Sequence, residues 1–106
     1  MQTTSTFSLD TVIPLVGRLI REIQSDGAPV ATHEAIARRL LSDPAGRRLA
    51  TAAFREQDSR RSLEHVASNM VAWFSASYRK NRAELRHQFE RERVDGRYAY
   101  RQRAAV

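Results

Sequence analysis

The spacing of apolar side chains changes once along this chain, and that change constrains the fold more than any other feature. From Val12 to Tyr78, apolar residues recur every three or four positions, as they do on the buried face of an amphipathic helix. From residue 89 onward that spacing is lost, and short runs of charged and aromatic residues flank Asp95-Gly96. Asp-Gly between such runs predicts a hairpin, because a type I′ turn needs positive φ at both central residues. We therefore expect a mainly α chain with a small C-terminal β-hairpin.

The turn also fixes how the two strands of this hairpin pair, since residues equally distant from a two-residue connection lie opposite each other. The expected pairs are Arg93 with Tyr98 and Arg91 with Tyr100 on one face, and Glu92 with Ala99 and Glu90 with Arg101 on the other. Helix is the alternative for residues 90–93, so the first strand of the hairpin has a competing prediction and the second strand has none.

Capping residues divide the preceding sequence into helices. Asp10 is the expected N-cap of the first helix, with Pro14 in its first turn and an end at Asp26-Gly27. The following residues, 28–31, are expected to be extended, because Pro29 disfavours helix at the residue before it.

Two further helices are expected before the middle of the chain. Thr32 is the expected cap of a helix over residues 33–41. Asp43 is the expected cap of the next, residues 44–57, since it is followed by a proline at the first helical position.

The longest helix is expected over residues 60–79, capped by Asp58-Ser59. It has a wide apolar stripe, in which Trp73 and Phe74 are expected to be core residues. Residues 83–88 would add another helical turn or two.

Length and composition are those of one small globular domain. The 106 residues are 42% hydrophobic and 28% charged, which allows one modest core and does not resemble a disordered chain. We expect residues 1–9 to be a flexible leader, 10–103 the folded domain and 104–106 a tail.

The start is polar and uncharged, unlike a targeting peptide, and no apolar run approaches the ~20 residues of a membrane span, so a cytoplasmic protein is expected. Cysteine is absent, which excludes disulfides, thiol catalysis and cysteine-based zinc sites.

Positive charge is concentrated towards the C-terminal end. The formal net charge is +6, and residues 79–103 hold nine basic and four acidic side chains. Such a surface favours polyanions, nucleic acid first and anionic membranes second. All but one of the 18 basic residues are arginine, which suits bidentate contacts to phosphate and guanine, although a GC-rich genome also favours arginine.

Three or four helices followed by a basic hairpin resemble a winged helix-turn-helix domain, and the resemblance covers residues 10–103. In that comparison the first helix of the helix-turn-helix pair, the recognition helix and the wing correspond to residues 32–40, 60–79 and 89–101. Residues 44–57 depart from the pattern, because a compact domain of this family has a tight turn there. Residues 69–74 and 94–101 are also similar to small domains attached to bacterial restriction systems.

The resemblance implies that the recognition helix reads base edges in the major groove while basic groups hold phosphates. The candidate DNA-binding residues on this helix and just after it are Arg60, Arg61, His65, Ser68, Asn69, Arg79 and Lys80. Each also has a plainer interpretation, as part of the solvated face of a core helix, and Asn69 could cap a neighbouring backbone.

The wing supplies the remaining candidates, which are Arg91, Arg93, Arg97, Arg101 and Arg103. Arginine interleaved with aromatic residues is typical of phosphate contact and minor-groove insertion. The alternative is that Tyr98 and Tyr100 pack on the core and that the arginines pair with Glu90 and Glu92. We expect structural tyrosines and DNA-binding arginines.

Enzyme chemistry has little support in this sequence. His33-Glu34 begins like a metallopeptidase helix, but Ala37 stands where the second histidine is needed. The three histidines have no metal-ligand spacing, no glycine-rich loop follows a strand, and no serine lies in a nucleophile-elbow context. We expect no catalytic residue, no cofactor and no metal.

The leading hypothesis is a sequence-specific double-stranded DNA-binding protein, a small transcriptional regulator that acts by occupying an operator, most simply as a homodimer. The second is a protein-interaction or DNA-targeting accessory module of a larger restriction or toxin system. The third is RNA binding, although the sequence lacks the exposed aromatic sheet motif of the common single-strand readers. Neither a membrane nor a small-molecule substrate is expected as a partner.

Overall fold

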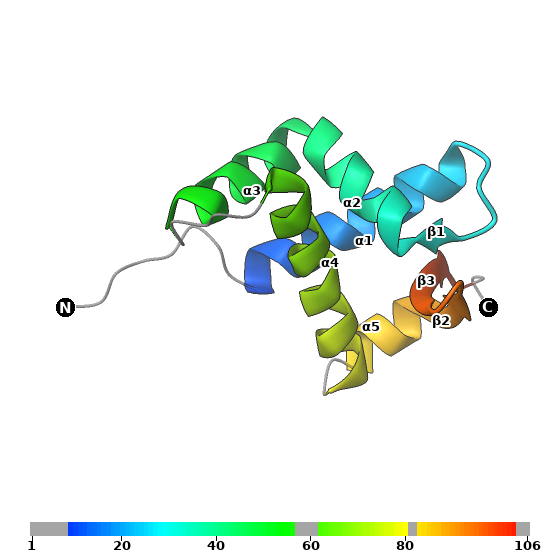
Figure 1. Ribbon diagram of the computed structural model, residues 1–106. Helices are drawn as coiled ribbons and strands as arrows, with labels where there is room; N and C mark the ends of the chain where they lie inside the picture. The colour runs from blue at the N-terminus through cyan, green and yellow to red at the C-terminus, as the bar shows by residue number, and fades with distance from the viewer. Residues whose placement is uncertain (1–8, 57–61, 81–82, 104–106) are drawn as a thin grey trace.

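The computed structural model describes residues 9–56, 62–80 and 83–103, and this part of the chain forms five helices and three strands (Figure 1). In chain order the elements are α1 (Leu9–Ser25), β1 (Ala31–Thr32), α2 (His33–Ser42), α3 (Pro44–Glu56), α4 (Leu63–Arg79), α5 (Ala83–Gln88), β2 (Phe89–Val94) and β3 (Arg97–Gln102). The prediction of a mainly helical chain with a small C-terminal hairpin is confirmed. Within the described ranges, no helix combines the length and the apolar character needed to cross a bilayer.

Helix α1 packs against α2, α4 and the sheet. Its apolar residues recur at helical spacing, and four aliphatic side chains are completely buried: Val12, Val16, Leu19 and Ile20. The helix begins at Leu9, so the prediction that Asp10 is its N-cap is wrong. An acidic residue is also favourable inside the first turn, where it faces the positive end of the helix dipole, so Asp10 alone did not mark the boundary. Pro14 consequently lies inside the helix, beyond the first turn.

A one-residue turn joins α2 to α3, and both predicted caps are confirmed. At the start of α2, the Thr32 hydroxyl accepts a hydrogen bond from the Ala35 backbone N–H at 3.2 Å. At the turn, the Asp43 carboxylate accepts one from the Gly46 N–H at 3.0 Å. Pro44 takes the first position of α3, where a missing N–H costs little.

Two further contacts fix the corner between α2 and α3. A Cβ on Gly46 would overlap the backbone carbonyl oxygen of Leu40, so only glycine lets the two helices approach this closely. From α1, the two terminal nitrogens of Arg18 donate to the two Asp43 carboxylate oxygens at 3.0 and 2.9 Å. The start of α3 is therefore tied to both preceding helices.

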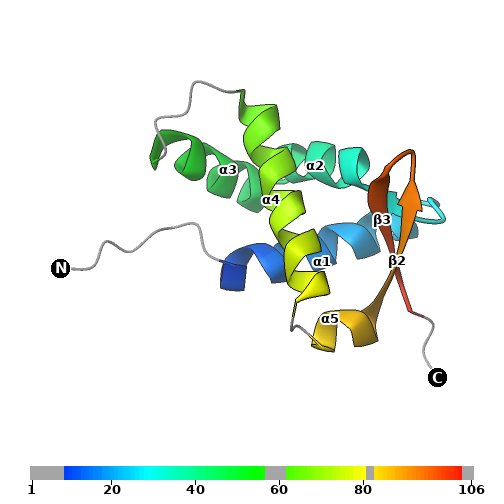
Figure 2. The ribbon, with the colours of Figure 1, turned by 60° about the horizontal axis from the view of Figure 1, so that its bottom comes forward.

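Helix α4 is central and packs against α1, α2 and α3 (Figure 2). The Ser62 hydroxyl caps it by accepting a hydrogen bond from the His65 N–H at 3.1 Å. The helix begins at Leu63, so the predicted start at Arg60 behind an Asp58-Ser59 cap is wrong. Several residues before the helix are good caps by type, so the sequence did not single out Ser62. Leu63, the first residue of α4, packs against the core.

The hairpin has the predicted turn and register. The turn has positive φ at Asp95 (53°) and Gly96 (81°), as a type I′ connection requires. Strands β2 and β3 are antiparallel, and all four expected pairs are present: Arg93–Tyr98, Glu92–Ala99, Arg91–Tyr100 and Glu90–Arg101. The helical alternative for residues 90–93 is thereby excluded.

A third strand, β1, completes the sheet in the order β1-β3-β2. The sequence predicted only an extended segment here. It pairs antiparallel with β3, with Ala31 opposite Tyr100 and Thr32 opposite Ala99. This pairing holds the hairpin beside the first turn of α2.

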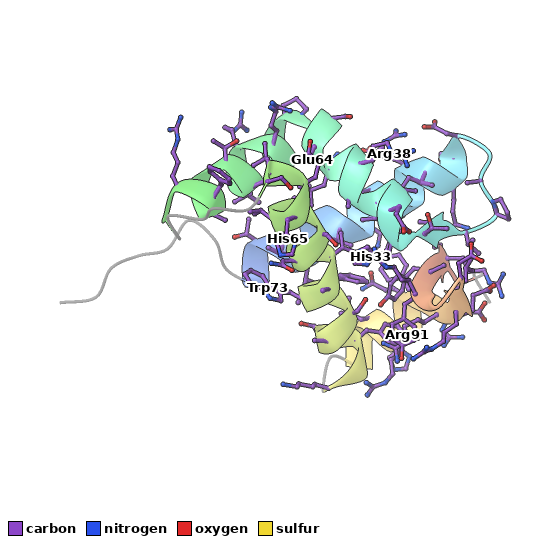
Figure 3. All side chains as sticks on the ribbon, viewed as in Figure 1. His33, Arg38, Glu64, His65, Trp73 and Arg91 are labelled. Carbon is purple, nitrogen blue, oxygen red and sulfur yellow. The ribbon has the colours of Figure 1, made fainter. Side chains whose placement is uncertain are left out.

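Aromatic rings fill the core where α4 meets the hairpin. Phe74 is fully buried, and its ring packs edge-to-face on Phe89 and Tyr100, with centroids 6.0 and 5.1 Å away. The core prediction for Phe74 is confirmed, but the same prediction for Trp73 is wrong, because Trp73 is half-buried and lies outside the core cluster (Figure 3). One step along a helix is a rotation of about 100°, which moves Trp73 off the buried stripe.

Candidate nucleic-acid interface

A groove of about 550 Å³ lies between α2, the start of α4 and the tip of the hairpin. Its walls, which define the α2–α4 groove, are His33, Glu34, Ala37, Arg38, Leu41, Ser42, Arg47, Glu64, Ser68 and Arg97. The hairpin closes one end, where an Arg97 nitrogen lies 3.5 Å from a Glu34 carboxylate oxygen. The charged walls are three arginines and two glutamates, so the groove carries both signs (Figure 3).

A side-chain hydrogen bond links α2 and α4 at this groove. His33 Nε2 lies 2.7 Å from Ser68 Oγ. Burial, and then the nearby Arg97 guanidinium, lower the pKa of His33 below its ordinary value, which favours the neutral ring at pH 7. Ser68, a predicted base-reading residue, is therefore half-buried, and its hydroxyl already has a partner within the protein.

The outer face of α4 carries the other predicted candidates of this helix. Asn69 is exposed, and His65 is partly exposed one turn before it (Figure 3). Lys80 is exposed directly after the helix, while Arg79 is its last residue and has a side chain outside the described part. The candidates Arg60 and Arg61 also lie outside the described residues. The described side chains of this face include no arginine.

One face of the hairpin is a stack of arginines and tyrosines. The Arg91 guanidinium lies 4.6 Å from the centroid of the Tyr78 ring and 3.9 Å from that of Tyr98. It also donates a hydrogen bond to the Ser75 carbonyl oxygen at 3.2 Å, so Arg91 fastens the hairpin to α4 (Figure 3). Arg93 lies 5.2 Å from the Tyr98 centroid and is exposed.

The opposite face of the hairpin is a network of ion pairs. Arg101 contacts Glu90 at 2.9 Å and Glu92 at 3.0 Å, and Arg103 contacts Glu90 at 3.1 Å. Pairing with Glu90 and Glu92, the alternative considered for the wing, is thus present for these two arginines. A phosphate would have to compete with these carboxylates.

Sequence reasoning missed a second set of arginines on α2 and α3. They are exposed, and no ion pair joins them to another described side chain: Arg38, Arg47, Arg48 and Arg55. Three carboxylates in this part of the chain are engaged by other arginines, since Arg18 pairs with Glu22 and Asp43, and Arg39 with Glu22 and Asp26. A count for each helix would have revealed them, because α3 has three arginines and one acid, at its last residue.

The described residues contain no group of three or more side chains that could hold a metal ion. In comparisons with known proteins, no family model, no curated protein and no solved structure matches this chain.

Proposed function

We propose that this chain is a winged helix-turn-helix domain that binds double-stranded DNA. The observation that carries the proposal is the position of the hairpin. Strand β1 pairs with β3 directly before α2 begins, so the hairpin flanks the α2–α4 pair as a wing flanks a helix-turn-helix. At its tip, Arg97 reaches Glu34 in the first turn of α2.

In this proposal the outer face of α4 enters the major groove, which is wide enough to admit an α-helix. Exposed Asn69 contacts an adenine through its amide, and His65 lies one turn before it. Because neutral contacts to base edges displace few counterions, affinity comes from phosphate contacts around this face. Two exposed arginines of the wing, Arg93 and Arg97, make such contacts.

Sequence-specific binding of this kind regulates transcription by occupying an operator. We assign that role to this chain, in the cytoplasm and as a homodimer on a pseudo-palindromic site, because half-sites in such operators mirror a protein two-fold axis.

The test is a selection of bound sequences from a random duplex pool with three proteins. We expect the wild type to enrich a motif and Asn69→Ala to relax preference at one base position, with a loss of about 1–3 kcal/mol on the specific site. Non-specific affinity should change less, because Asn69 has no charge whose counterions could be released. The control is Gln102→Ala, which removes an exposed amide from the far end of β3 and should leave the motif intact.

If the wild type enriches no motif, sequence-specific regulation is wrong. If a motif appears and Asn69→Ala leaves every position unchanged, α4 is not the reading helix, and α2 with α3 becomes the candidate.

One observation favours a second function, docking on a partner protein such as a larger nuclease or a toxin. The α2–α4 groove carries both signs of charge, and three wing arginines are already paired with carboxylates: Arg97, Arg101 and Arg103. Such a surface suits the mixed charges of a protein better than a uniformly negative backbone. Under this function, Asn69→Ala leaves duplex binding unchanged and weakens the complex with the partner.

A further inference from the structure

Helix α3 has an arginine face that takes no part in the proposed DNA contact of α4 and the wing. Arg48 and Arg55 are exposed and seven residues apart, which is about 10 Å along the helix and nearly the same side of it. Between them lie the smaller side chains of Thr51 and Ala52, so a ligand can approach the helix closely. A shallow hollow of about 760 Å³ covers this face.

No described carboxylate balances the charge of this face. The first turn of α3 has no acidic residue, and neither Arg48 nor Arg55 has an ion pair with another described side chain. The one acid of α3, Glu56, has a side chain outside the described part. The hairpin differs, because Glu90 and Glu92 hold Arg101 and Arg103 there. Of these two basic regions, α3 therefore has the arginines that are more available to an external anion.

The position of this face is also fixed. At the α2–α3 corner, Gly46 packs closely against the Leu40 backbone, and Arg18 donates two hydrogen bonds to the Asp43 carboxylate. A rigid helix presents its arginines at a constant distance from α4, which lowers the entropic cost of ordering them on a ligand.

Both ribbon views place α3 on one side of α4 and the hairpin on the other (Figures 1 and 2). A helix in the major groove has a phosphate backbone on each side of it. Over about 10 Å of axis, one DNA strand presents about three phosphates, enough for two guanidinium groups.

We infer that Arg48 and Arg55 form a second phosphate-binding surface, which holds the backbone on the side of the major groove opposite the wing. This inference rests on the proposed DNA binding and extends its footprint to α3. It gives a role to the helix that stands where a compact helix-turn-helix has only a turn.

The experiment measures binding of a fluorescent duplex of mixed sequence by anisotropy over a series of NaCl concentrations. The variant is Arg48→Gln/Arg55→Gln. If both side chains hold phosphates, the slope of log affinity against log salt should fall in magnitude by about 1.8. Its melting midpoint should equal that of the wild type, because these two side chains form no ion pair with the rest of the described structure.

The matched control is Arg21→Gln/Arg39→Gln, which removes the same charge from α1 and α2. Arg39 is paired with Asp26 at 2.6 Å, and Arg21 donates to Gln88 at 2.9 Å, so the slope should stay near that of the wild type. An unchanged slope in Arg48→Gln/Arg55→Gln overturns the inference and leaves the proposed function standing. An equal change in both pairs also overturns it, since net charge alone would then explain the effect. A wild type that binds no duplex rejects the inference together with the proposed function.

Discussion

Trp73 and Phe74 are adjacent in sequence and lie in different environments. Phe74 is fully buried between Phe89 and Tyr100, whereas Trp73 is half-buried outside the core cluster. Hydrophobicity ranks both as core residues. The direction in which each side chain points depends on how α4 is rotated against α1 and α2, which is set by the packing of all three helices together.

This difference predicts unequal costs for two substitutions. Phe74→Ala should lower the free energy of unfolding by about 3–5 kcal/mol, because a fully buried ring leaves a cavity and two edge-to-face contacts are lost. Trp73→Ala should cost clearly less, although the side chain removed is larger. Urea unfolding followed by circular dichroism measures both, and a Trp73→Ala cost equal to that of Phe74→Ala would contradict this assignment of the core.

At the scale of elements, the α2–α3 corner depends on one ionised carboxylate. The Arg18 guanidinium, chiefly through hydrogen bonds, lowers the pKa of Asp43 below its ordinary value of 3.8, and the Gly46 backbone N–H adds to the effect. The carboxylate therefore stabilises the fold fully above about pH 3.8, and this contribution is lost as pH falls through the lowered pKa.

Asp43→Ala should consequently cost about 0.5–2 kcal/mol at pH 7, the usual range for a lost helix cap. The difference from the wild type should shrink as pH falls below 3.8. The control is Asp26→Ala, which removes the more exposed partner of Arg39 and should cost under about 1 kcal/mol. Thermal melts of the three proteins across pH check this, and a difference that grows in acid would show that Asp43 is protonated in the native corner.

The hairpin shows where sequence reasoning succeeds and where it stops. Its turn and register follow from local chemistry, because Asp95-Gly96 specifies positive φ and the turn then sets every pair. The third strand, β1, could not be predicted from the sequence, because two residues are too few to show a periodicity. It is a strand only because it pairs with β3, which is distant in sequence.

The candidate interface was harder to predict than the fold. That an arginine is basic can be read from the sequence, but whether a carboxylate neutralises it depends on contacts between distant residues. Arg97, for example, meets Glu34 of α2, and Arg18 meets Asp43. Contacts of this kind occupy carboxylates near α3, and its arginines have no ion pair with another described side chain. The total charge of this part of the chain is nearly balanced, so it did not indicate them.

On the scale of the whole molecule, the balance of charge in the hairpin predicts a gain of function. Glu90→Gln/Glu92→Gln should release Arg101 and Arg103 and add two units of positive charge to the proposed wing. Duplex affinity should rise, with a steeper dependence on salt, because more counterions are displaced on binding.

The matched control for this gain is Glu22→Gln/Asp26→Asn, which adds the same charge around Arg39. Titration of a labelled duplex at several salt concentrations compares the two pairs. Equal gains in duplex affinity for the two pairs would mean that added charge in the hairpin strengthens DNA binding no more than added charge elsewhere.

The central strand of the sheet, β3, is also the last of the described elements in chain order. During synthesis on the ribosome, the helices emerge first, and the apolar face of α1 and α4 stays uncovered until Phe89 and Tyr100 follow. Two of the three central aromatic rings thus arrive after the five described helices have been made. A nascent chain that stalls at the end of α5 would expose an apolar surface of the kind that chaperones bind, and its core would close only once β3 has left the exit tunnel.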